Sequence, residues 1–191
     1  IRDLVRSRGL GDVYKRQTIF LKEISLSLIN PGMDEIDRKI IDIVQVDGRV
    51  TNAALAEATG LSVSAANERL RRLQDRGVIT GWGARVDPEA VGLELLAFLF
   101  VLVDRTEHNA GFIEAATALP EVLELHHVTG EWSYLLKVRV AGTKALERLV
   151  SDRIKAIPGV ARSLTFIALS SAKETAALPV PGPVSGSGGR G

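Results

Sequence analysis

Apolar residues recur at helical spacing in the first part of the chain and at strand spacing in the second. Residues 34–46 carry one apolar stripe, formed by Ile36, Ile40, Ile43 and Val44. Asp34 and Asp37 suit the first turn of this helix and its dipole. Two further helices are predicted over residues 52–59 and 63–76, with the following residues facing inward: Leu55, Ala58, Ala66, Leu70 and Leu73.

Residues 55–72 have the pattern of a helix-turn-helix. Ala56 is the small residue needed where two helices cross, and Gly60 suits a turn at positive φ. Ser62 then acts as the N-cap of an Arg-rich helix. Because the second helix of such a motif enters the major groove of DNA, the pattern predicts DNA binding rather than catalysis. Residues 78–86 are expected to form a short strand or wing.

The second half follows the order β-α-β-β-α-β. The strands are predicted over residues 95–103, 122–128, 133–140 and 160–169, and the helices over 109–119 and 144–156. Residues 118–122 resemble 156–160, because each has a helix end, a proline and the start of a strand. Two joined β-α-β units predict a ferredoxin-like domain. The expected fold class is therefore α+β, with an N-terminal winged helix-turn-helix domain followed by a ferredoxin-like βαββαβ domain.

The strand at residues 95–103 is apolar on both faces. The helices of a ferredoxin-like domain cover only one face of its sheet, so the other apolar face lacks a cover within one chain. A second subunit is the expected cover, which predicts a homodimer and larger assemblies.

The two ends of the chain are expected to lie outside the domains. Residues 7–17 resemble a translated transposase adapter from sequencing libraries, so residues 1–32 are predicted to be a non-native or upstream segment, with a native arm over 18–32 as the alternative. The predicted boundaries are 33–86 for the helix-turn-helix domain, 87–94 for a linker and 95–178 for the ferredoxin-like domain. Residues 179–191 are predicted to be a disordered tail, because they are rich in Pro, Gly and Ser.

Charge and cysteine content limit the kinds of site and surface that this chain can carry. The formal net charge is +1, and residues 1–17 alone contribute +3 (five Lys/Arg less two Asp/Glu), which leaves 1 − 3 = −2 for the rest. Any DNA-binding surface must therefore be local. The chain has no Cys, which excludes disulfides and thiolate metal sites and fits a reducing cytoplasm. No apolar run approaches the roughly 20 residues that span a bilayer, so no membrane association is expected.

Three segments together resemble the Lrp/AsnC family of transcriptional regulators: MDEIDRKIIDIVQVDGRV, GLSVSAANERLRRLQDRGVITGW and HHVTGEWSYLLKVRV. The resemblance covers about residues 33–178. It implies a regulator that binds double-stranded DNA, forms homo-oligomers and senses a small molecule, expected to be an amino acid. No cofactor or metal is expected. The DNA-binding residues are predicted to be Ser62, Ser64, Ala65, Asn67, Glu68, Arg69, Arg71 and Arg72.

Roles within the DNA-binding set follow from helix position. The residues near the helix N-terminus are expected to read bases, and Arg71 and Arg72 to contact guanine or phosphate. Arg69 flanks the buried seam, so it is expected to anchor the helix or contact phosphate. The alternative for the whole set is a solvated face with pairs such as Glu68–Arg72.

The turn at residues 129–134 is the predicted effector site. Its members are Thr129, Gly130, Glu131, Trp132, Ser133 and Tyr134. The resemblance implies an amino-acid pocket near this turn, with Glu131 available to an ammonium group and the two aromatic rings available to an apolar side chain. The alternative is an ordinary hairpin whose rings lie in the core or in a dimer interface.

Two other functions remain as alternatives. Sirohaem decarboxylases resemble this family in both domains, and His126, His127 and Arg139 would then serve a tetrapyrrole carboxylate. A chromosome-organising protein with little sequence preference is the other alternative. A metal site formed by both histidines is not expected, because adjacent strand residues point to opposite faces.

Overall fold

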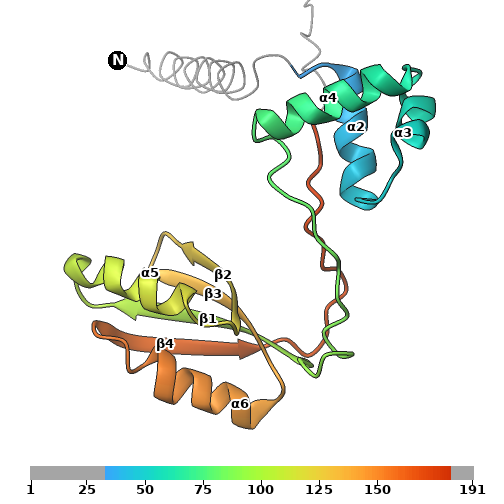
Figure 1. Ribbon diagram of the computed structural model, residues 1–191. Helices are drawn as coiled ribbons and strands as arrows, with labels where there is room; N and C mark the ends of the chain where they lie inside the picture. The colour runs from blue at the N-terminus through green and yellow to red at the C-terminus, as the bar shows by residue number, and fades with distance from the viewer. Residues whose placement is uncertain (1–32, 182–191) are drawn as a thin grey trace, which may run out of the picture. The chain divides into compact units, whose positions relative to one another are not determined.

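The structure, a computed structural model, describes residues 33–181. Within this range the chain forms two compact units, one of residues 33–83 with 176–181 and one of residues 84–175 (Figure 1). The predictions for residues 1–32 and 182–191 lie outside the described range. None of the helices in residues 33–181 has the length and apolar character needed to cross a membrane.

The first unit is a three-helix bundle of α2 (Glu35–Val46), α3 (Asn52–Thr59) and α4 (Val63–Asp75). Each helix begins at a capping side chain: Asp34, Thr51 and Ser62 accept hydrogen bonds from backbone N–H groups three residues later. Helix α3 ends at Gly60, whose φ of 72° is strained for a residue with a Cβ. The N–H of Leu61 then donates to Ala56 O at 3.0 Å, which closes the predicted turn.

The core of this unit joins the faces of all three helices. Ile40, Leu55 and Ala66 are fully buried, and Leu73 is nearly so. Ala56 is buried as predicted, whereas the prediction for Ala58 was wrong, because its side chain lies on the exposed side of the short helix. Residues 78–86 contain no strand, since they pair with no other strand in the described chain, and they run as an extended loop.

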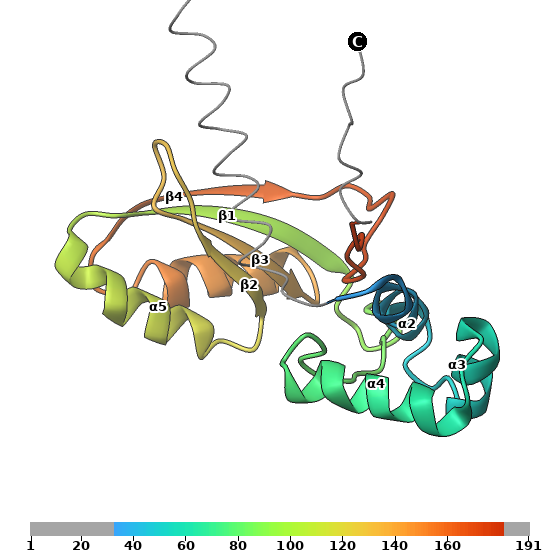
Figure 2. The same cartoon turned by 90° about the horizontal axis from the view of Figure 1, so that it is seen from above.

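The second unit is a four-stranded antiparallel sheet in the order β2-β3-β1-β4. The strands are β1 (Leu95–Val103), β2 (Val122–His127), β3 (Tyr134–Val140) and β4 (Val160–Ile167). Helices α5 (Asn109–Thr117) and α6 (Thr143–Arg148) pack on one side of the sheet (Figure 2). A 3₁₀ turn, η1 (Thr106–His108), precedes α5. The predicted α+β fold class is confirmed.

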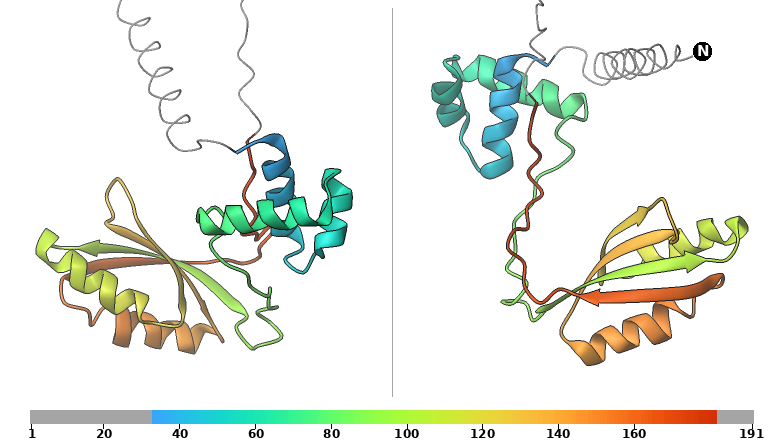
Figure 3. Two further views of the ribbon diagram at one scale, coloured as in Figure 1. Left: turned by 45° about the horizontal axis from the view of Figure 1, so that its top comes forward. Right: turned by 180° about the vertical axis from the view of Figure 1, so that it is seen from behind.

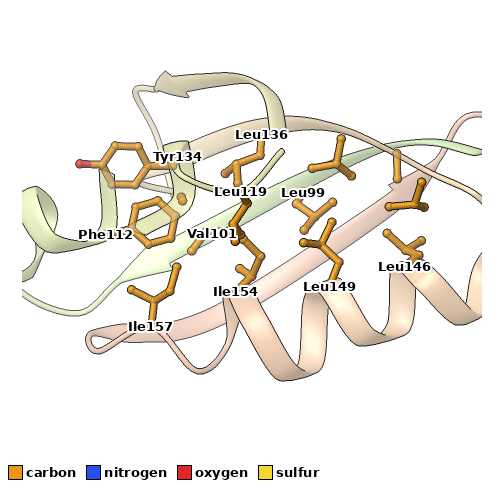
Figure 4. Close-up of a cluster of buried hydrophobic side chains, with 14 of the residues drawn as sticks. Leu99, Val101, Phe112, Leu119, Tyr134, Leu136, Leu146, Leu149, Ile154 and Ile157 are labelled. Carbon is orange, nitrogen blue, oxygen red and sulfur yellow. The ribbon is translucent and has the colours of Figure 1, made fainter. Parts of the chain in front are cut away.

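The core of the second unit lies between the sheet and its two helices (Figure 4). Leu99 and Val101 of β1 are fully buried there, with Phe112 of α5 and Ile154 beyond α6. The helix after α6 widens into a π-helical stretch, η2 (Leu149–Ile154), in which Lys155 N donates to Val150 O, five residues earlier, at 3.0 Å. This widening keeps Leu149 and Ile154 on the buried side.

The C-terminal segment differs from the expected tail. Residues 179–181 lie within the described range, and Val180 packs against the core of the three-helix unit. The proline-rich composition predicted disorder there, but Leu178, just before it, makes specific backbone contacts with α2.

Candidate nucleic-acid interface and effector site

The outer face of α4 carries the predicted DNA-binding residues. Six of them are exposed: Ser62, Ser64, Asn67, Glu68, Arg71 and Arg72. The hydroxyl oxygens of Ser62 and Ser64 lie 3.1 Å apart at the start of the helix. Asn67 Oδ1 accepts from Asn52 Nδ2 of α3 at 3.2 Å. The start of α4 therefore presents small polar groups of the type that hydrogen-bond base edges.

Arg71 and Arg72 differ in their local partners. Arg71 pairs with Glu68 at 3.4 Å and Asp75 at 3.9 Å, and the hydrogen bond that it donates to the Glu68 carboxylate raises the pKa of Arg71. These pairs are exposed to solvent, so they contribute little to stability. In residues 33–181 no ion pair is formed by Arg72, so the expected Glu68–Arg72 pair is replaced by Glu68–Arg71.

Arg69 faces the opposite way, toward the start of α2. One of its guanidinium nitrogens lies 2.5 Å from Asp34 Oδ2 and 2.8 Å from Asp37 Oδ1. The same two acids form a reciprocal capping box, with Asp37 N donating to Asp34 Oδ1 at 2.8 Å. Arg69 therefore connects α4 to the N-terminus of α2. Of the two roles expected for Arg69, anchoring the helix or contacting phosphate, this geometry favours anchoring.

The anchor perturbs the pKa of both partners in Arg69–Asp34. The Asp37 backbone N–H and then the Arg69 guanidinium hold the pKa of Asp34 below its usual value. The Asp34 and Asp37 carboxylates raise the pKa of Arg69. Asp37 is the one buried charged residue in the described chain, at 8% exposed.

The predicted effector turn separates its two aromatic side chains. Gly130 has a φ of 109°, as this tight turn requires. Tyr134 is buried in the core, with its ring 4.8 Å from that of Phe112. Trp132 lies instead beside Phe100, at 6.1 Å between ring centroids. Tyr134 thus has the core position given as its alternative, whereas Trp132 lines a cavity.

The cavity beside Trp132 has a volume of ≈ 420 Å³ and a lining formed by Trp132, Lys155, Val160, Ala161, Arg162, Ser163 and Leu164. The Arg162 guanidinium carbon lies 5.2 Å from the centre of the Trp132 ring, and Glu131 lies 3.8 Å from Arg162. The cavity therefore combines two cations, one nearby carboxylate and an aromatic wall. Sequence reasoning missed Lys155 and Arg162, because only the fold brings them next to the turn.

A charged network lies on the helix-free side of the sheet. Lys137 Nζ contacts Glu124 at 3.2 Å and Glu174 at 3.0 Å, and Glu174 also pairs with Arg139. Lys137 lowers the pKa of Glu174 and has its own pKa raised in return. Arg139, a candidate carboxylate binder in the decarboxylase alternative, is thus engaged by Glu174 and by the carbonyl of Leu93 at 3.3 Å.

The two adjacent histidines lie on opposite faces of β2. His126 is paired across the ladder with Leu135 and contacts Glu124 at 3.1 Å, whereas His127 stacks on Tyr134 at 5.1 Å. Residues 33–181 contain no group of three or more potential metal ligands.

A helix-turn-helix unit followed by a βαββαβ unit is the architecture of a two-domain DNA-binding regulator. Residues 33–80 match the family described as winged helix-turn-helix DNA-binding, and residues 96–178 match the Lrp/AsnC ligand binding domain. The HTH-type transcriptional regulator FL11 of Pyrococcus horikoshii is 38% identical over 78% of this chain and 97% of its own length.

Two solved structures are also similar. A transcriptional regulator from Neisseria meningitidis in complex with L-methionine has a TM-score of 0.75 at 33% identity, covering 78% of this chain and 97% of its own. The feast or famine regulatory protein from M. tuberculosis, also complexed with L-methionine, has a TM-score of 0.73 at 38% identity, covering 78% of this chain and 100% of its own. The chain belongs to the Lrp/AsnC family of transcriptional regulators, as its sequence predicts.

Proposed function

We propose that this chain is a sequence-specific DNA-binding regulator whose sheet unit forms a dimer and binds an amino acid. The observation that carries the DNA-binding role is the division of the arginines of α4. Arg69 is held by Asp34 and Asp37, while Arg71 and Arg72 point to solvent. One arginine fixes the helix, and the other two are available to phosphate or guanine.

We propose that the helix-free face of the sheet is the dimer interface. Phe166 and Leu164 of β4 are 53% and 42% exposed on this unit. Phe166 and Leu164 are register partners of Phe98 and Phe100, so apolar side chains of β1 and β4 form one continuous patch. A second copy related by two-fold symmetry would bury both patches, and it would present two copies of α4 to paired half-sites. Larger assemblies would build on this dimer.

We propose that the cavity beside Trp132 binds the amino-acid effector. Lys155 and Arg162 would hold its carboxylate, and Glu131 its ammonium group. Trp132 would pack against an apolar side chain, which suits ligands such as the L-methionine bound by the two similar proteins. The effector acts by preferring one assembly state, since a ligand of equal affinity for both states shifts nothing.

A non-enzymatic, cytoplasmic role follows from the same assignment. The decarboxylase alternative assigned His126, His127 and Arg139 to a tetrapyrrole carboxylate, and the position of the two histidines on opposite faces of β2 does not favour it. The names of the relatives favour regulation over catalysis.

The DNA assignment is tested by selecting a preferred duplex from a random pool and titrating variants against it. Arg71→Ala and Arg72→Ala should each weaken binding, and a lost phosphate contact should reduce the slope of log affinity against log salt by about one. Lys39→Ala is the matched control, because Lys39 is an exposed cation on α2. Unchanged affinity in both arginine variants would refute the assignment.

The effector assignment is tested by calorimetric titration with L-methionine and the other common amino acids. Trp132→Ala should abolish the binding of any amino acid that the intact chain binds, whereas Thr129→Ala should preserve it, because Thr129 does not line the cavity. Binding that survives Trp132→Ala would place the effector elsewhere.

A further inference from the structure

Residues 176–181, here called the strap, contact a helix more than 130 positions earlier in the chain. The side-chain amide of Gln45 accepts from Leu178 N at 2.7 Å and donates to Leu178 O at 3.1 Å. One glutamine thus satisfies both backbone groups of one residue, as a neighbouring strand would. The strap belongs to the same compact unit as α2, where it can be followed in red beside the blue helix (Figure 3).

At the centre of this contact, Gln45 binds the backbone of Leu178 rather than its side chain. Leu178 as a whole is 72% exposed, although both of its main-chain polar groups are bonded. Pro179 and Pro181 have no N–H to satisfy, and Pro179 also favours an extended conformation at Leu178. The strap therefore loses little conformational freedom when it binds.

The strap forms one wall of an apolar groove of ≈ 480 Å³. Ile41 and Val44 of α2 line it, together with Ile79 and Trp82 from the loop after α4. Trp82 packs so closely over Gly48 that a Cβ there would lie 3.3 Å from its ring. Val180 of the strap packs against the helix core. The groove thus offers an apolar floor and one bidentate amide.

We propose that the α2 side of this groove, with the loop after α4, is a docking surface for an extended, proline-containing segment, and that the strap of the same chain is the segment that docks there. Docking covers the apolar side of α2 and completes the folded three-helix unit. The DNA-binding unit is therefore discontinuous in sequence, and its last part comes from the chain beyond the sheet unit. Gln45 is the residue that selects this backbone register.

The test compares amide hydrogen exchange of α2 in the full chain, in two matched pairs of variants and in one further variant of Gln45. Deletion of residues 176–191 should raise α2 exchange, whereas deletion of residues 182–191 should not. Leu178→Pro, which removes the bonded N–H, should raise it, whereas Leu178→Ala should not. Gln45→Met, which keeps length and removes both hydrogen bonds, should raise it by roughly 5- to 30-fold, while exchange in β1 and β3 stays unchanged.

Two further arms identify the occupant. A synthetic peptide of residues 174–181, ETAALPVP, added to the 176–191 deletion should restore α2 protection in a saturable manner. In the intact protein, protection should be independent of protein concentration. Protection that rises with concentration would assign the groove to the strap of a second copy and overturn the intrachain assignment. Unchanged α2 exchange in both Gln45→Met and the longer deletion would overturn the docking surface itself.

Discussion

Replacing Arg69 by Met tests the distinction between anchoring and DNA-contacting arginines. Methionine keeps most of the aliphatic stem and removes both ion pairs to α2. Asp34 has a side chain 50% exposed, so it regains water and contributes little to the loss. Asp37 has a side chain only 11% exposed, and it keeps one long bond from Asp34 N at 3.4 Å. We expect the free energy of unfolding of the helix unit to fall by about 2 kcal/mol, because a largely buried carboxylate loses its charged donor.

Urea unfolding followed by Trp82 fluorescence measures this loss in a Trp132→Phe background, where Trp82 is the remaining tryptophan. Arg71→Met is the matched control and should change stability by no more than about 0.5 kcal/mol, because its pairs are exposed. At low temperature, where Arg69→Met is still folded, its DNA affinity should stay within about twofold of the parent, because it loses less than about 0.4 kcal/mol of binding energy. Parental stability combined with lost DNA affinity would refute the anchoring role.

Two further predictions follow from the contacts of the same units. The pKa of Asp34 is lowered in the folded state, so its ionised form stabilises the helix unit above about pH 4, near its unfolded pKa. This contribution is lost as the pH falls toward the folded value. Acid unfolding followed by Trp82 fluorescence should therefore become less steep in Asp34→Asn, and an identical profile would contradict the linkage. On the sheet unit, Phe166→Glu should convert dimers to monomers, as measured by light scattering after size exclusion. Ile113→Glu, an equally drastic change at an exposed site on the helix side, should leave the dimer intact. A Phe166→Glu variant that remains dimeric would place the interface elsewhere.

Local signals predicted most elements of both units. The caps Thr51 and Ser62 and the turn glycine Gly60 act within a few residues of their own helix, so a single sequence displays them. The strand at residues 95–103, which is apolar on both faces, likewise predicted a sheet with an uncovered apolar side. The exposed Ala58 was mispredicted because a two-turn helix has too few positions for its buried side to be read from spacing alone.

The candidate sites were harder to predict than the helices and strands, because they are built from residues that are distant in sequence. Arg69 meets acids 35 and 32 positions away, and Gln45 meets Leu178 across 133 positions. No periodicity encodes such pairs, because they exist only after the elements have packed. The turn at residues 129–134 was recognisable, but only the fold reveals that Tyr134 enters the core and that Arg162 joins Trp132.

The central claim is that the exposed face of α4 reads DNA sequence. Competition binding at fixed salt, with the selected duplex and a random duplex of equal length, tests it most directly. The account predicts that the full chain prefers the selected duplex by about a thousandfold or more, and that Arg72→Ala weakens this binding. Equal affinity for both duplexes, unchanged in Arg72→Ala, would contradict it and favour a DNA-binding protein without sequence preference.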